Sequence, residues 1–275
     1  MEDAYSLDRN GRSTQTDEWL KGRFSLFERF CLPSINSQTC KNFIWFVLFS
    51  TDTPEEYKER INNYERSFSY FKPLFLSNGD YGSIIKIFNQ EMLNFTHLDD
   101  KYIITSRIDN DDAYHKDMIL EIQSFFKKQR NMFLNFDYGL QYDVQRKVLV
   151  NMHYVNNHFI SRFEKISDGV ETVITYNHAF INDAGDVHYI NNHKKPTWIE
   201  IIHDGNVSNN LRASSKPVFH NRYFKSFGIN ETISYKQTLL IFYKYSKRNI
   251  YVHMAHFLRK IGLYDFAKKT YHWLK

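Results

Sequence analysis

The stretch "KYIITSRIDNDD" (residues 101–112) places three aspartates in four positions directly behind an apolar run. An apolar run bounded by polar residues is typical of a strand that is covered on both faces. Acidic side chains usually lie in solvent, whereas this cluster follows a strand that belongs to a core. In parallel α/β sheets, ligands bind outside the carboxyl ends of the strands. The stretch therefore predicts a binding site at Asp109–Asp112, provided that the chain around it forms such a sheet.

The sequence on both sides of this stretch alternates between helical and strand patterns. In the first helix, residues 17–32, apolar side chains recur at spacings of three and four, with Asp17 as the expected N-cap and Pro33 as the end. The later helices are expected at residues 53–68, 82–95 and 115–130, and the strands at residues 42–50, 71–77 and 100–108. This alternation predicts an α/β fold with a mainly parallel sheet and flanking helices.

The second half of the chain has a different pattern. Strands and hairpins are expected at residues 131–143, 147–155, 171–181 and 186–192. Helical patterns resume at Ser234 and predict two or three C-terminal helices. We therefore expect a mixed or antiparallel second half. The expected division is a main domain over residues 1–235 and basic amphipathic helices over residues 236–275.

The positive charge of the chain is concentrated at its end. The chain carries a net charge of +5, and residues 236–275 contain nine basic residues and one acidic residue. A basic segment with many aromatic residues fits an anionic membrane surface or a nucleic acid. The sequence contains no recognisable nucleic-acid-binding motif, so we expect no nucleic acid partner. Peripheral contact with an anionic membrane and simple packing of helices with a solvated basic face both stay open.

The composition indicates a folded protein of the cytoplasm. The chain is 42% hydrophobic and 24% charged, as in globular proteins. Its polar start does not have the pattern of a signal peptide, and its apolar runs are too short for a membrane span. Two cysteines, Cys31 and Cys40, in a chain of this length indicate a reducing compartment. We expect a cytoplasmic protein and, if its basic end binds lipid, one at the inner face of the cytoplasmic membrane.

The aspartates have the chemistry of a metal site. Mg²⁺ and Mn²⁺ prefer carboxylate oxygens, and alternate residues of an extended segment point the same way, so Asp109 and Asp111 are expected to share one ion. Such an ion neutralises a diphosphate leaving group. Arg107 is expected to bind a phosphate or to balance the aspartates. Alternatively, Asp112 caps the following helix and the pattern has arisen by chance.

Three blocks of the sequence resemble one family of enzymes. They are "ERFCLPSINSQT" (residues 28–39), "SRIDNDDA" (residues 106–113) and "WIEIIHDGNVSN" (residues 198–209). In this order, they resemble the bacterial putative rhamnosyltransferase family of GT-A-type glycosyltransferases. The resemblance implies a GT-A-like fold, a nucleotide-diphosphate-sugar donor and a divalent metal, Mn²⁺ or Mg²⁺. It implies a hexosyltransferase that transfers a sugar such as rhamnose to a glycan or lipid-linked acceptor in bacterial surface polysaccharide synthesis.

The third block supplies further candidates for the donor site. GT-A enzymes often complete the metal shell with a late histidine, so the resemblance implies His203 as the third ligand beside Asp109 and Asp111. A hydrogen-bonded turn histidine is the alternative. Trp198 either stacks on a sugar or is buried. The donor contacts are assigned to Arg107, Asp109, Asp112, Trp198 and Asn206.

The catalytic base is expected to be a carboxylate. If the transfer inverts the sugar, a carboxylate must take the proton from the acceptor hydroxyl as it attacks. Asp204 is our first candidate because it lies beside His203 in the sequence. Glu200 and Glu171 are the alternatives, and the sequence does not rank them.

One part of the GT-A pattern is missing from this sequence. GT-A chains open with a strand that ends in the nucleotide-binding loop, where this family usually carries a Thr-Arg-Phe phrase. Here a polar stretch leads into the first helix, and no apolar strand precedes Trp19. Two alternatives to the enzyme therefore stay open: a truncated, inactive glycosyltransferase-like binding protein, and a metal-dependent nucleotidyl- or phosphotransferase. The sequence has no glycine-rich phosphate loop to favour the last.

Overall fold

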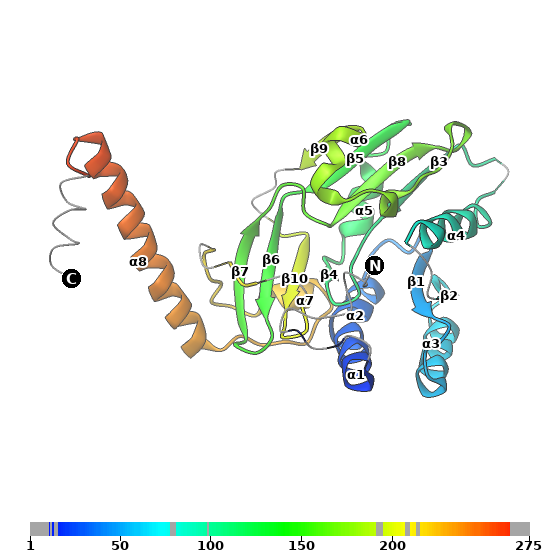
Figure 1. Ribbon diagram of the computed structural model, residues 1–275, viewed down its shortest axis with the longest axis horizontal. Coiled ribbons are helices and arrows are strands. Elements are labelled where there is room, and N and C mark those ends of the chain that lie inside the picture. Colours follow the sequence, from blue (N-terminus) through cyan, green and yellow to red (C-terminus); the bar gives the residue numbers. More distant parts are fainter. Residues whose placement is uncertain are drawn as a thin grey trace.

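Helices and strands alternate through the first half of the chain, as the sequence predicts (Figure 1). The computed structural model of the protein describes residues 11, 13, 16–77, 81–97, 99–190, 195–206, 210–212 and 215–264, without the side chains of residues 81–84. The elements are α1 (Asp17–Leu26), a π-helical turn (Phe27–Cys31), α2 (Leu32–Asn36), β1 (Trp45–Ser50), α3 (Glu55–Ser67), β2 (Phe71–Leu76), α4 (Tyr81–Leu93), β3 (Tyr102–Ser106), β4 (Ala113–Tyr114) and α5 (Met118–Ser124).

The second half contains most of the remaining strands and one long helix. The elements are β5 (Asn131–Phe136), β6 (Tyr138–Asp143), β7 (Val148–His153), β8 (Ile160–Lys165), 3-10 turns at Ile166–Asp168, Val173–Thr175 and His178–Phe180, α6 (Ile181–Ala184), β9 (Asp186–Ile190), β10 (Trp198–Ile202), α7 (Arg222–Ser226) and α8 (Tyr235–Lys260). Residues 265–275, where further helix is predicted, lie outside the described residues.

The strand predicted at residues 171–181 is wrong, because this segment forms helical turns. Its backbone groups bond to side chains instead of to a neighbouring strand. The Glu164 carboxylate accepts from the N–H groups of Glu171 and Thr172, at 2.9 and 3.0 Å, and Thr105 Oγ1 accepts from the N–H of Val173 at 2.9 Å. The strand β8, which the sequence did not predict, supplies Glu164 to this arrangement. Side chains of this kind satisfy backbone donors without a ladder.

The first helix also differs from the prediction at both ends. Thr16 is the N-cap instead of Asp17, because Thr16 Oγ1 accepts from the N–H of Trp19 at 3.2 Å. The chain does not leave the helical path at Pro33. The π-helical turn ends at Cys31, and α2 follows it directly at Leu32 and runs past Pro33 to Asn36. Pro33 falls in the first turn of α2, where a missing N–H costs nothing.

The strands form three sheets. β1 and β2 pair in parallel, the second sheet has the order β4-β10-β6-β7, and the third has the order β3-β8-β5-β9. β10 and β6 are parallel, as are β5 and β9, whereas β4, β7 and β8 run antiparallel to their partners. The α/β fold, consistent with a GT-A-like arrangement, is confirmed. The single mainly parallel sheet is replaced by three smaller ones, because β3 pairs with β8 and not with β1.

A large cavity lies between the first and third sheets. Among the described residues, β1 pairs only with β2, and β3 pairs only with β8. Residues 44–50 and 102–107 line a cavity of about 1620 Å³, together with the aspartate motif. The strand that the GT-A pattern would place beside the motif therefore has no counterpart in the described part of the chain.

An aromatic stack packs against the second sheet at the start of β10. Trp198 at the start of β10 is 1% exposed, and its ring stacks on Phe159 with centroids 4.8 Å apart. Its indole N–H donates to the carbonyl of Phe136 at 2.8 Å. Gly139 of β6 lies directly under the indole, since a Cβ at that position would overlap the ring. The packing of β6 on β10 therefore requires glycine at residue 139.

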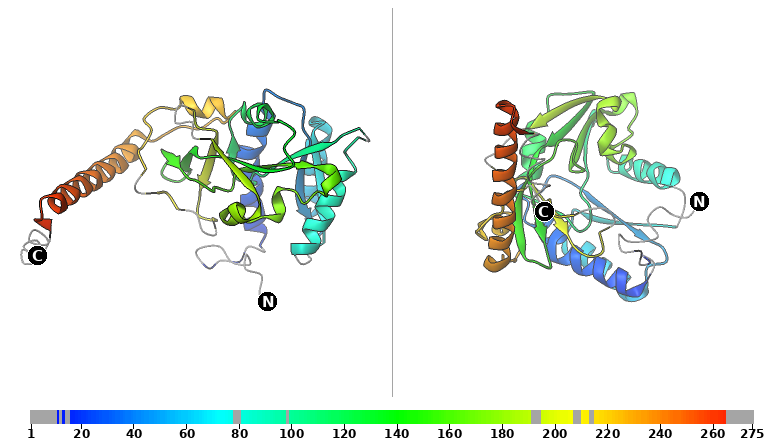
Figure 2. Two further views of the ribbon diagram at one scale, coloured as in Figure 1. Left: turned by 90° about the horizontal axis from the view of Figure 1, so that it is seen from above. Right: turned by 60° about the vertical axis from the view of Figure 1, so that its left-hand side comes forward.

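The helix α8 leaves the three sheets at Ser234 and extends away from them (Figure 2). Its first turn is fastened by the N–H of Ser234, which donates to the carbonyl of Lys147 at 2.7 Å. No helix in the described ranges is both long enough and apolar enough to cross a bilayer.

We expect Gly139→Ala to lower the free energy of unfolding by about 2 kcal/mol, because the new methyl overpacks a buried ring that cannot move. Urea denaturation followed by circular dichroism measures the change. Gly22→Ala on α1 is the control, since no atom lies within 4 Å of the added Cβ, and it should be neutral or slightly stabilising. Equal stabilities of the two variants would show that Trp198 is not tightly held.

Candidate metal-binding and donor site

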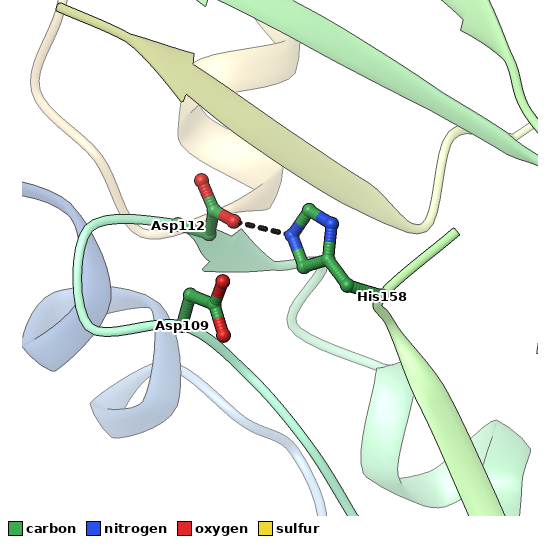
Figure 3. Close-up of side chains that lie close together, drawn as sticks. All are labelled: Asp109, Asp112 and His158. Carbon is green, nitrogen blue, oxygen red and sulfur yellow. Dashed lines mark hydrogen bonds and ion pairs between the residues drawn. The ribbon is translucent and has the colours of Figure 1, made fainter. Parts of the chain in front are cut away.

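The aspartate motif is a tight turn and not an extended segment. β3 ends at Ser106, and the N–H of Asp112 donates to the carbonyl of Asp109 at 3.1 Å. Such a bond brings the first and fourth residues of a turn together. The carboxylates of Asp109 and Asp112 therefore face each other, with His158 beside them (Figure 3). One ligand atom from each of these three residues lies within 4.8 Å of the other two.

Asp112 connects this turn to two sheets. The residue is 3% exposed, and its Oδ1 accepts from the N–H of Ile201 in β10 at 2.8 Å. Its Oδ2 lies 2.7 Å from His158 Nε2. Burial raises the pKa of Asp112 although the hydrogen bond to His158 opposes the shift. Burial alone would lower the pKa of His158, but the hydrogen bond and charge of Asp112 raise it.

Asp111 lies in a separate cluster. Its Oδ2 accepts from Arg23 Nη1 of α1 at 3.0 Å and lies 2.9 Å from His203 Nε2. Burial would raise the pKa of this carboxyl, but the hydrogen bond from His203 and the charge of Arg23 lower it to about 2. Asp111 is therefore ionised and already balanced by the Arg23 cation.

The structure brings Asp111 and His203 together, at 2.9 Å, as expected from their chemistry. In the described part of the chain, a different group, Asp109, Asp112 and His158, has ligand atoms close enough to hold an ion. The ligand set of Asp109, Asp111 and His203 stays a prediction. The prediction assumed that residues alternate in direction along a strand. The turn at Asp109–Asp112 breaks that alternation, so residues three apart meet and residues two apart do not.

Four of the five predicted donor residues, Arg107, Asp109, Asp112 and Asn206, line the cavity beside the turn. Arg107 reaches Asp109 Oδ1 with its Nε at 3.2 Å, and both residues line the cavity. Asn206 lies at the other side of the same cavity, and its Oδ1 accepts from the N–H of His203 at 2.6 Å. Arg107 offers a cation to a phosphate, while Asn206 holds the loop after β10 in place.

Trp198, expected as a donor contact, lies in the core instead. The ring is 1% exposed, lies against Phe159 and does not line the cavity. All the other residues of β10 are buried as well, so neither face of the strand is open to a sugar. The commoner alternative, a buried aromatic residue, is the correct one for this position.

The three candidate bases also lie away from the cavity lining. Asp204 is in the exposed turn after β10, where its carboxylate accepts from Gln145. Glu200 is 6% exposed and accepts from Gln141 Nε2 at 2.5 Å. Glu171 pairs with Arg162 at 3.0 Å. The assignment of Asp204 as the base stays a prediction.

The first sequence block supports the motif through its side chains. Ser34 Oγ in α2 accepts from the N–H of Tyr114 at 3.2 Å. Gln38 donates from Nε2 to the carbonyl of His115 at 2.8 Å, and its Oε1 accepts from the N–H of Ile119 at 3.1 Å. Residues 28–39 therefore fix the backbone that follows the aspartates.

The family whose description is "Putative rhamnosyl transferase" matches residues 3–215 of the 275-residue chain. The chain belongs to this family. The matched range contains all three sequence blocks, the aspartate turn and the residues around it, whereas α8 lies beyond it. The resemblance found in the sequence is confirmed, and it supports a glycosyltransferase. No curated protein matches the chain.

Sequence reasoning missed two residues of this candidate site. Arg23 lies four residues after Trp19 and four before Phe27, on the apolar face of the first helix. A basic residue at a core-facing position indicates a buried acidic partner, and this signal was available. His158 is 46 residues from Asp112, and nothing in its surroundings indicates that contact.

We expect Arg23→Met to lower the free energy of unfolding by about 2 kcal/mol at neutral pH, because the buried Asp111 carboxylate loses its cation. Denaturation of this variant, of Asp111→Asn and of the double variant measures the coupling between them. Lys21→Met on the exposed side of α1 is the control and should change little. Additive effects of the two substitutions would contradict the ion pair.

Proposed function

We propose that the chain is a metal-dependent hexosyltransferase that moves a sugar, such as rhamnose, from a nucleoside diphosphate to a glycan or lipid-linked acceptor. One observation carries the proposal: two carboxylates and an imidazole gather at a turn that opens on a 1620 Å³ cavity, in a chain of this family. A site of this size suits a nucleotide sugar, and the acidic turn suits the cation that accompanies a diphosphate.

The residues at the turn fit Mn²⁺ or Mg²⁺. Carboxylate oxygens suit both ions, and imidazole nitrogen favours Mn²⁺. A bound divalent ion acts as a Lewis acid on the diphosphate leaving group. Asp109 has a side chain that is 41% exposed, so it offers its oxygens to the cavity. Asp112 and His158 share a proton that they must release when they become ligands.

The remaining residues around the turn have supporting roles in this proposal. Arg107 binds the diphosphate, for which its place in the cavity is suitable. We assign Asp111 and His203 to holding the turn against α1 through Arg23, instead of to the ion. Asp204 is our proposed base, and acceptor binding would replace its bond to Gln145.

The chemistry of the acceptor suggests where the enzyme works. Lipid-linked acceptors of bacterial surface polysaccharides lie at the membrane, so we place the enzyme in the cytoplasm, at the inner face of the cytoplasmic membrane. Both cysteines are free, which agrees with a reducing compartment.

One observation favours a second candidate function, a binding protein without transfer activity. In the described residues, the strand expected beside the aspartate turn has no counterpart, and the edges of β1 and β3 line the cavity instead. Such a protein would bind nucleoside diphosphates without cleaving the sugar bond.

We expect release of nucleoside diphosphate from one member of a panel of nucleotide sugars when Mn²⁺ is present, and loss of this release when a chelator removes the metal. Asp109→Asn should lower the rate by about 100-fold, because it removes a ligand of the metal. Without the bound cation, no positive charge of the metal would balance the negative charge that develops on the diphosphate. Asp99→Asn, an exposed aspartate outside the cavity lining, is the control. Binding without release for every donor would leave the binding protein as the correct function.

Titration calorimetry with Mn²⁺ distinguishes the two ligand sets. We expect Asp109→Asn and His158→Gln to weaken Mn²⁺ binding by at least about 10-fold, because each removes a ligand atom. Asp111→Asn should retain the parent affinity in the folded fraction, since its carboxylate faces Arg23. The reverse order of effects would restore the set of Asp109, Asp111 and His203.

A further inference from the structure

The helix α8 carries an unusual share of the exposed apolar surface. Of the 22 large hydrophobic side chains that are exposed in the described part of the chain, 12 lie between Tyr235 and Leu263. Exposed apolar side chains gathered in one place mark an interaction surface. The helix extends away from the sheets (Figure 1), and these twelve side chains are 40 to 66% exposed.

Six of these twelve side chains form one stripe along the helix. Leu239, Tyr243, Ile250, Met254, Phe257 and Ile261 follow one another at spacings of four, seven, four, three and four. Residues at these spacings share one face of a helix. Their exposed fractions run from 47 to 66%. The first turn meets the body on another face, because Thr238 is fully buried and Phe242 contacts Phe219 at 5.6 Å.

The charge of α8 has a single sign. Six basic residues lie between Tyr235 and Lys260, all of them exposed, and the helix contains no aspartate or glutamate. Lys247 lies four residues after Tyr243 and three before Ile250, so it lies in the stripe itself. Long basic side chains in such a position place their carbon stems on the apolar surface and their charges at its rim.

The charge decides between the possible occupants of this stripe. A second copy of the chain would bring two cationic helices together, and like charges repel. A phospholipid leaflet with anionic headgroups is apolar inside and negatively charged at its boundary. It is therefore complementary both to the apolar stripe and to the positive charge of α8. The helix does not meet the requirements of a membrane span, so it would lie along the surface.

We propose that α8 is a lipid-binding helix that lies flat on an anionic leaflet, with its apolar stripe among the acyl chains and its lysines and arginines at the headgroups. Its 26 residues give about 39 Å of contact along the membrane. The surface lies outside residues 3–215, which match the family, and binding requires neither the metal nor the transfer reaction.

Flotation of the full chain with vesicles tests the proposal. We expect the protein to float with vesicles of phosphatidylcholine and phosphatidylglycerol and to remain free with phosphatidylcholine alone. The triple variant Lys236→Gln, Lys244→Gln, Lys247→Gln should bind about 100-fold more weakly, because three headgroup contacts are lost. The triple variant Ile250→Gln, Met254→Gln, Phe257→Gln should bind at least about 10-fold more weakly. Circular dichroism checks that both stay folded.

A matched control separates the helix from the overall charge. Lys21→Gln, Lys86→Gln, Lys127→Gln removes three exposed charges outside α8 and should leave vesicle binding within about twofold of the parent. Equal losses for this variant and the α8 charge variant would overturn the proposal. Equal binding to neutral vesicles would also overturn it, as would dimerisation through the stripe or binding of duplex DNA without binding of vesicles. None of these results depends on sugar transfer, so a failed donor assay and a failed flotation are separate outcomes.

Discussion

The arrangement of the candidate site depends on the buried carboxylate of Asp112. A buried carboxylate is tolerated only where hydrogen bonds replace the water that it loses. Here one oxygen accepts from the backbone of Ile201 and the other meets His158. Ile201 belongs to β10 of the second sheet, and His158 lies just before β8 of the third sheet. The side chain of Asp112 therefore joins the second sheet, the third sheet and the turn. The same contact places His158 beside Asp109 and thereby creates a group that can hold a cation.

The three aspartates have different environments although they are neighbours in the sequence. Asp111 faces α1, where Arg23 balances its charge and His203 gives it a hydrogen bond, while Asp109 faces the cavity beside Arg107. Asp112 is the most buried of the three, at 3% exposed. Because each carboxylate has its own partners, the motif can support a structural contact and a metal site at once. The side chains of Ser34 and Gln38 complete this support by fixing the backbone that follows the turn.

The strands β1 and β3, whose residues line the cavity, lie toward the opposite end of the molecule from α8 (Figure 1). The second sheet lies between them, with β7 on the side of α8 and β4 on the side of α1. A helix held on a membrane would therefore leave the cavity open to a donor from solution. This separation gives the two proposals independent physical grounds.

The sequence by itself determined the alternation of helices and strands in the first half, the end of β3 as the site, the family and the cationic end of the chain. Each of these follows from local patterns: apolar periodicity, residue type and charge. Only the tertiary structure decided that residues 109–112 turn back on themselves, that His158 completes the group, that Trp198 is buried and that β3 pairs with β8. These features depend on contacts between residues far apart in the chain. Their energies come from burial and pairing across the fold, and no local pattern records which distant groups will meet.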